Sequence, residues 1–146
     1  MTECRAIVLA VLCAASLSVG CGEPTGPDGS EFSFTLSASA WAPGDTLRGS
    51  LQNAGDREGI YNFCGTALDR WTGSGWTEAA ASVFSPSGVC AAIGFRLRPG
   101  ESADFAWGIP DTLSAGRYRV RTGVSIFSGD RYADRWVPTG PFAVTF

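Results

Sequence analysis

The stretch from Leu113 to Phe127, LSAGRYRVRTGVSIF, constrains the fold of this chain more than any other. Uncharged side chains occupy alternate positions along it: Tyr118, Val120, Thr122, Val124 and Ile126. The intervening positions at its start carry Arg117, Arg119 and Arg121. Successive side chains of a β-strand point to opposite faces, so this period of two predicts a half-buried strand. The other strands of the chain can be placed around this one.

Tyr118 follows a turn signal at Ala115-Gly116 and is the first inward residue of the predicted strand. A tyrosine in this place resembles the tyrosine corner of immunoglobulin-like sandwiches, whose hydroxyl bonds to nearby backbone. The resemblance implies that residues 113–127 form strand F, central in its sheet. It also implies a buried Tyr118 ring with a hydroxyl bonded to backbone in the crossing from strand E to strand F.

Six further strands are predicted from alternation and from turn residues. They are A at 32–40, B around 47–51, C at 60–65 continuing to 71, D at 92–98, E around 103–107 and G at 142–146. A Gly-rich hairpin is expected between Trp71 and Trp76, and residues 41–45 are expected to be a turn. On strand D, Ile93 and Phe95 are expected to point inward. Residues 79–89 and 128–139 are predicted loops.

Seven strands within residues 31–146 are typical of an all-β, immunoglobulin-like antiparallel β-sandwich. We expect strands A, B, E and D in one sheet and C, F and G in the other. The motifs PGDTLRGSLQNAGD, LRPGESADF and LSAGRYRVRTGV resemble the immunoglobulin-like domains of bacterial lipoproteins. Their order is also similar to a family of small intracellular bacterial proteinase inhibitors. Such motifs specify a fold and hardly any function.

Residues 1–20 are predicted to be a lipoprotein signal peptide. Residues 6–19 form an unbroken run of apolar and small side chains, too short to span a bilayer comfortably. The run ends in Leu-Ser-Val-Gly-Cys, which resembles the lipobox of bacterial lipoproteins and implies acylation of Cys21. The alternative is cleavage elsewhere, with Cys21 a spare thiol. Residues 21–30 would then be the lipidated cysteine and a flexible linker rich in proline and glycine.

The lipobox resemblance also implies a location in the bacterial cell envelope, lipid-anchored. The residue after the cysteine is Gly22 and not aspartate, which by the same resemblance favours the outer membrane over the inner in a Gram-negative cell.

Cys4 and Cys13 would leave with the signal peptide. Cys64 and Cys90 then remain as an even pair in an exported domain, for which a structural disulfide is the favoured interpretation over a redox or metal pair.

Missing residue types restrict the chemistry of the chain. It contains no histidine, which removes the commonest general base and metal ligand. All its basic residues are arginine, so no lysine can form a Schiff base. The net charge is −3 with signs interspersed, which argues against a nucleic-acid partner. The carboxylates considered for glycosidase chemistry are Asp69, Glu78, Glu101 and Asp104. Glu101 and Asp104, in a strand and its entry turn, are interpreted as solvated groups. We therefore expect no enzyme, catalytic residue, metal site or cofactor.

Two sets of residues are candidates for binding. The three-arginine stripe at 117–121 could bind an anion, although a solvated outer sheet face is the favoured interpretation. The 128–139 connection offers Arg131, Tyr132, Arg135 and Trp136, residue types enriched at binding hot spots. The favoured interpretation there is a twisted ribbon in which Trp136 packs on the sandwich edge.

The sequence thus predicts a membrane-anchored, non-catalytic lipoprotein. Its single domain would serve binding or assembly in the cell envelope. Its partners would be the membrane, through the N-terminal lipid, and a protein or glycan held by loops at the end of the sandwich. A proteinase inhibitor of the same fold is the alternative.

Overall fold

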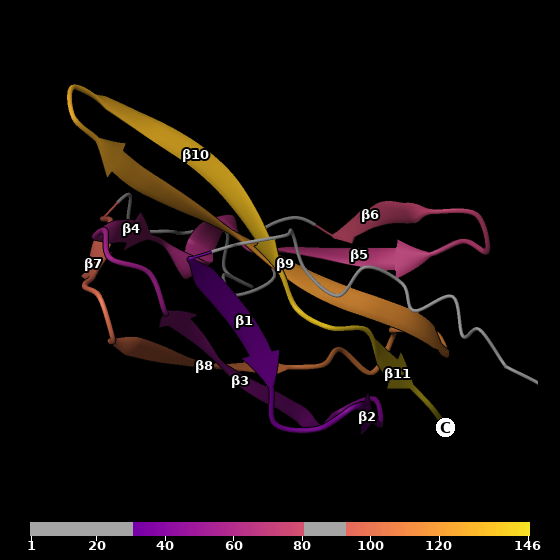
Figure 1. Cartoon of the computed structure of the whole chain (residues 1–146). Helices are drawn as coiled ribbons and strands as arrows, with labels where there is room; N and C mark the ends of the chain where they lie inside the picture. Colours follow the sequence, from indigo (N-terminus) through magenta and orange to yellow (C-terminus); the bar gives the residue numbers. More distant parts are fainter. Residues whose placement is uncertain (1–30, 81–92) are drawn as a thin grey trace, which may run out of the picture.

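A computed structural model describes residues 31–80 and 93–146 (Figure 1). The signal peptide, Cys21, the linker and Cys90 lie outside the described residues. The strands are β1 (Phe32–Leu36), β2 (Ala40–Trp41), β3 (Thr46–Asn53), β4 (Gly59–Tyr61), β5 (Ala67–Trp71), β6 (Trp76–Ala80), β7 (Phe95–Leu97), β8 (Ser102–Gly108), β9 (Gly116–Ser128), β10 (Arg131–Pro138) and β11 (Phe142–Val144). A short 3-10 helix, η1 (Phe63–Gly65), separates β4 from β5. No helix in this described part is long and apolar enough to cross a bilayer.

The strands form two sheets that pack as a sandwich, which confirms the all-β sandwich expected from the sequence. The smaller sheet has the order β1-β3-β8, and its neighbours run antiparallel. The larger sheet follows the path β2-β11-β9-β4-β7, with β10, β5 and β6 attached beside it. In Figure 1, β1, β3 and β8 of the smaller sheet lie below β5, β6, β9 and β10 of the larger sheet, while β11 and β2 lie at the lower right. Buried aromatic side chains fill the space between them, for example Phe34 and Phe105 with ring centres 4.7 Å apart.

Strand β9 organises the larger sheet, and the alternation predicted for it is confirmed. All five predicted inward residues are buried: Tyr118, Val120, Thr122, Val124 and Ile126. β9 pairs with β10 and β11 along one edge and with β4 and β5 along the other. The Tyr118 hydroxyl donates to the backbone carbonyl of Ser114 at 2.9 Å, as the tyrosine-corner resemblance implied.

Two predicted strands are divided, and β6 and β10 are additional, so the described residues contain eleven strands where seven were expected. Predicted strand A ends at Leu36, and the chain crosses to the other sheet, where β2 pairs in parallel with β11. Ala38 and Ala40 are therefore exposed, while Trp41, assigned to a turn, is buried. Predicted strand C is broken at η1, because the Asn62 side chain accepts the Cys64 backbone N–H and starts a helical turn.

The predicted sheet assignment of strand D is wrong. β7 pairs with β4, which places it in the larger sheet rather than beside β8. Only Leu97 of this strand is buried; Ile93 and Phe95 are 62% and 54% exposed. Next to this pairing, Asn53 is fully buried and donates its side-chain amide to the Leu97 carbonyl at 2.9 Å. This bond ties β7 to the end of β3 where the chain leaves for β4.

At 128–139 the structure has the ribbon and not the loop, since β10 is a regular strand. It pairs with β9 without a register shift, from Arg131 opposite Ser128 to Pro138 opposite Arg121. The turn between them contains Gly129 at a φ of 70°, a conformation that favours glycine. Figure 1 shows this β9–β10 ribbon extending past the rest of the sandwich at upper left. Residues 131–136 are exposed on both faces, which explains why no apolar alternation revealed the strand.

One smaller boundary also differs. Residues 79 and 80 were assigned to a loop, but they belong to β6. The predicted hairpin itself is confirmed, with Trp71 directly opposite Trp76 and their ring centres 5.3 Å apart.

Candidate binding surface on the β9–β10 ribbon

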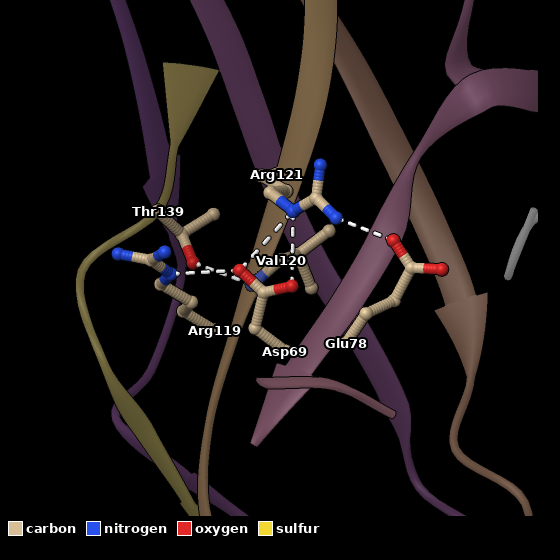
Figure 2. A network of polar contacts seen from close by, with 6 residues as sticks. All are labelled: Asp69, Glu78, Arg119, Val120, Arg121 and Thr139. Atoms are coloured by element: carbon tan, nitrogen blue, oxygen red, sulfur yellow. Dashed lines mark hydrogen bonds and ion pairs between the residues drawn. The ribbon is translucent and has the colours of Figure 1, made fainter. Parts of the chain in front are cut away.

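The base of the ribbon is fixed by a buried carboxylate between two arginines (Figure 2). Asp69 on β5 is 3% exposed and lies directly opposite Arg119 on β9. Arg119 Nε donates to Asp69 Oδ2 at 3.0 Å, and Arg121 Nε donates to Asp69 Oδ1 at 2.9 Å. Arg121 also contacts Glu78 on the neighbouring strand β6 through Nη2. A buried carboxylate is stable only when it is paired and hydrogen-bonded, and both conditions hold here.

This cluster corrects the interpretation of the arginine stripe. The side chains of Arg119 and Arg121 are only 27% and 18% exposed, and their charges are compensated by β5 and β6. They are therefore neither a solvated outer face nor an open anion site. The sequence could not reveal this arrangement, because it depends on the register between β5 and β9.

A second contact in the same place joins the far end of β10 to β9. The Val120 N–H donates to Thr139 Oγ1 at 3.1 Å, and the Thr139 N–H donates to the Val120 carbonyl at 2.7 Å (Figure 2). Thr139 is 5% exposed, so these bonds are shielded from water. The ribbon thus leaves the sandwich from a rigid base.

Aromatic rings and arginines alternate along the outer face of β9. The Arg117 guanidinium lies 5.9 Å from the ring centres of both Trp71 and Trp76. Arg119 lies 4.7 Å from the Trp76 ring centre, and Arg121 lies 4.3 Å from that of Trp136. These distances are within the range of cation–π attraction. Asp69, which binds both Arg119 and Arg121, links the contacts at the β5–β6 hairpin to the contact on the ribbon.

The distal part of the ribbon exposes the residues predicted for binding. The structure places Arg131, Tyr132, Arg135 and Trp136 together on β10, all exposed. Tyr132 is 60% exposed and pairs across the strands with Phe127, at 5.2 Å between ring centres. By the alternation of a strand, Tyr132, Asp134 and Trp136 share one face, and Arg131, Ala133 and Arg135 share the other. Sequence reasoning missed Phe127 as part of this surface.

The carboxylates considered for catalysis are held in other roles. Asp69 and Glu78 are opposite each other on β5 and β6, but Arg121 binds both. The Glu101 carboxylate accepts the Arg98 backbone N–H at 2.8 Å. Asp104 lies exposed on β8, in the other sheet.

Burial raises the pKa of Tyr61, so that phenol stays neutral at physiological pH. Within residues 31–80 and 93–146, no three potential ligands gather into a metal site.

Comparison with known proteins supports the fold. No family model matches the chain, and no curated protein is similar to it in sequence. A solved ceramidase, "complexed with C2", is similar with a TM-score of 0.52 and 13% identity, covering 97% of this chain and 23% of that one. Neutral ceramidase from Pseudomonas aeruginosa is similar with a TM-score of 0.51 and 12% identity, covering 83% and 20%. This chain spans less than a quarter of either, and at such identities the likeness shows the fold alone.

Proposed function

We propose that this chain is a lipid-anchored, non-catalytic binding or assembly module of the bacterial cell envelope. The observation that carries the proposal is the β9–β10 ribbon, which holds two exposed large aromatic side chains and two exposed arginines of β10 beyond the sandwich body. Tyrosine, tryptophan and arginine dominate binding hot spots. Because the ribbon has a fixed base, little conformational entropy would be lost when it binds.

The non-catalytic part of the proposal is supported by the residue inventory. The chain has no histidine or lysine to activate a nucleophile. Two of its four carboxylates of interest, Asp69 and Glu78, are bound by arginine, and a third, Glu101, caps a turn. These four carboxylates therefore do not supply the free pair of carboxyl groups that hydrolysis of a glycoside requires.

The anchor is supported by the run of residues 6–19 and the lipobox-like sequence ending at Cys21. Cys21→Ser should move the protein from the membrane fraction to the soluble fraction. Cys13→Ser, inside the expected signal peptide, is the matched control and should leave the distribution unchanged. If Cys21→Ser fractionates like the parent protein, the anchor proposal is wrong.

The binding role is tested in the native envelope with a photo-crosslinking side chain in place of Tyr132. The same side chain in place of Arg48, exposed on β3 of the other sheet, is the control. An adduct formed from position 132 and absent from position 48 is expected.

A panel of proteases, each tested with a stoichiometric amount of this protein, separates the binding role from the proteinase-inhibitor alternative. That alternative predicts that the activity of one protease falls.

A further inference from the structure

The outer edge of β10 is open in the part of the chain that the structure describes. Among these residues, β10 pairs with β9 alone. β10 also lies against β1 of the smaller sheet, and a parallel bridge joins Phe34 to Thr139 just beyond its end; its first six residues, 131–136, are exposed. Proline, which cannot donate a backbone hydrogen bond, stands only at the last position, Pro138. The edge therefore presents a row of backbone donors and acceptors to solvent, and such a row is a template for another strand.

β10 differs from the other edge strands in length and exposure. β2 and β7 have two and three residues, and β1 and β6 have five. β8 has seven, but its Phe105 and Trp107 are buried in the core, so one of its faces is covered. β10 has eight residues, and the first six are exposed on both faces. An added strand could thus make side-chain contacts on both faces of the ribbon.

The charges on β10 disfavour a second copy of this chain as that strand. A two-fold antiparallel pairing places a residue opposite itself at the centre. The two registers with the greatest overlap along Arg131–Pro138 would place Asp134 opposite Asp134, or Arg135 opposite Arg135. Like charges directly opposite each other destabilise a sheet. The edge is therefore protected against self-association, while its hydrogen-bonding groups stay available to a different sequence.

The same charges indicate the chemistry of the partner. Arg131 and Arg135 lie on one face, four residues apart, with the small Ala133 between them. The only ion pair of Arg131 within the described residues is to Asp130 at 3.9 Å, and both side chains are more than 80% exposed. Arg135 forms no ion pair with any described residue. Two exposed guanidiniums with so little compensation are complementary to two carboxylates on a facing strand.

From this geometry we infer that β10 accepts an extended acidic segment of a partner protein as an added strand, with acidic side chains opposite Arg131 and Arg135. The inference rests on the proposed binding role of the ribbon and names its partner class. Backbone hydrogen bonds would hold the segment, and the two arginines would select its sequence and register. Tyr132 and Trp136 would cover apolar residues on the opposite face of the added strand.

The test uses the mature, lipid-anchored protein in detergent and a capped synthetic peptide, Thr-Glu-Val-Thr-Val-Glu-Val-Thr. Its two glutamates are four residues apart, and a control peptide carries lysine in their place. In an NMR titration, the glutamate peptide should shift the amide signals of residues 131–137 and bind roughly tenfold more tightly than the lysine peptide. The double variant Arg131→Glu, Arg135→Glu should reverse this preference. Arg48→Glu, the same charge change on β3, should leave it intact.

Equal binding of both peptides, shifts centred on another strand, or an unchanged preference in the double variant would each overturn the inference. Reversal of the preference also shows that the double variant is folded. The crosslinking experiment distinguishes failure of the acidic-strand inference from failure of the proposed binding role of the ribbon. A crosslink from position 132 with no peptide binding leaves the ribbon as a binding surface and rejects the acidic strand. Failure of both experiments rejects the binding role itself.

Discussion

The guanidinium of Arg121 lies 4.3 Å from the ring centre of Trp136 and also binds the buried carboxylate of Asp69. One arginine therefore connects an exposed ring of the ribbon to a buried carboxylate of β5. Gly123 lies opposite Trp136 across the strands, and its missing side chain leaves the indole room to rest on the ribbon. The ring is 54% exposed, so it covers the ribbon without filling the core.

Trp136→Ala should lower the free energy of unfolding by about 1–2 kcal/mol, because a half-exposed ring and one cation–π contact are lost. Tyr132→Ala should change it by only about 0.5 kcal/mol. Urea titrations of both variants check these values. A loss of about 3 kcal/mol or more from Tyr132→Ala would identify its ring as core and remove it from the binding surface.

Asp69→Asn should destabilise the fold by about 2–4 kcal/mol, because two partly buried guanidiniums lose the carboxylate that compensates them. Asp104→Asn is the matched control on an exposed strand position and should cost less than about 0.5 kcal/mol. Equilibrium unfolding of the two variants side by side gives the comparison. Similar small losses from both would mean that the arginine cluster adds nothing to stability.

Tyr118→Phe removes the hydroxyl that donates to the Ser114 carbonyl and should cost about 0.5–1.5 kcal/mol. The ring stays in place, so the variant should keep the parent fold. Tyr132→Phe makes the same chemical change on the exposed ribbon and should cost nothing measurable. The tyrosine-corner interpretation fails if thermal melts do not separate the two variants.

Gly49→Ala should be among the most damaging small substitutions in the smaller sheet. A Cβ at Gly49 would lie 2.2 Å from the Thr35 backbone carbonyl oxygen and 2.5 Å from the Phe105 ring. Neither strand β1 nor the buried ring can move aside without disturbing the packing of the sheet. We therefore expect the free energy of unfolding to fall by about 3 kcal/mol. Gly108→Ala, with no atom within 4 Å of its added Cβ, should be nearly neutral. Comparable melting temperatures for both variants would contradict the packing at Gly49.

The Cys64–Cys90 disulfide remains a prediction, since Cys90 lies outside the described residues. A bridge between them would contribute about 3 kcal/mol. Cys64→Ser, Cys90→Ser and the double variant should then lose the same stability, and non-reducing mass spectrometry should find no alkylatable pair in the parent protein. Two free thiols, or additive losses in the double variant, would reject the bridge.

Sequence periodicity could predict β9 because one of its faces is fully buried and the other is not. The same logic failed for β10, whose distal residues have no buried face, and for β7, in which Leu97 alone is buried. Asp69 could not be recognised as a buried ion-pair partner, because its environment is set by pairing with a strand about fifty residues later. Composition identified the exposed aromatic and arginine residues of the ribbon, but only the register placed them on one strand.

The exposed tip of the ribbon contributes little to the core, whereas β9 pairs with four other strands. Amide hydrogens near Gly129 should therefore exchange through local fraying, and those from residue 118 to 124 only through global unfolding. Foldedness and the proposed binding surface are in this way carried by separate parts of one hairpin. Substitutions at the tip should therefore change the exposed surface without lowering the fraction of molecules that are folded.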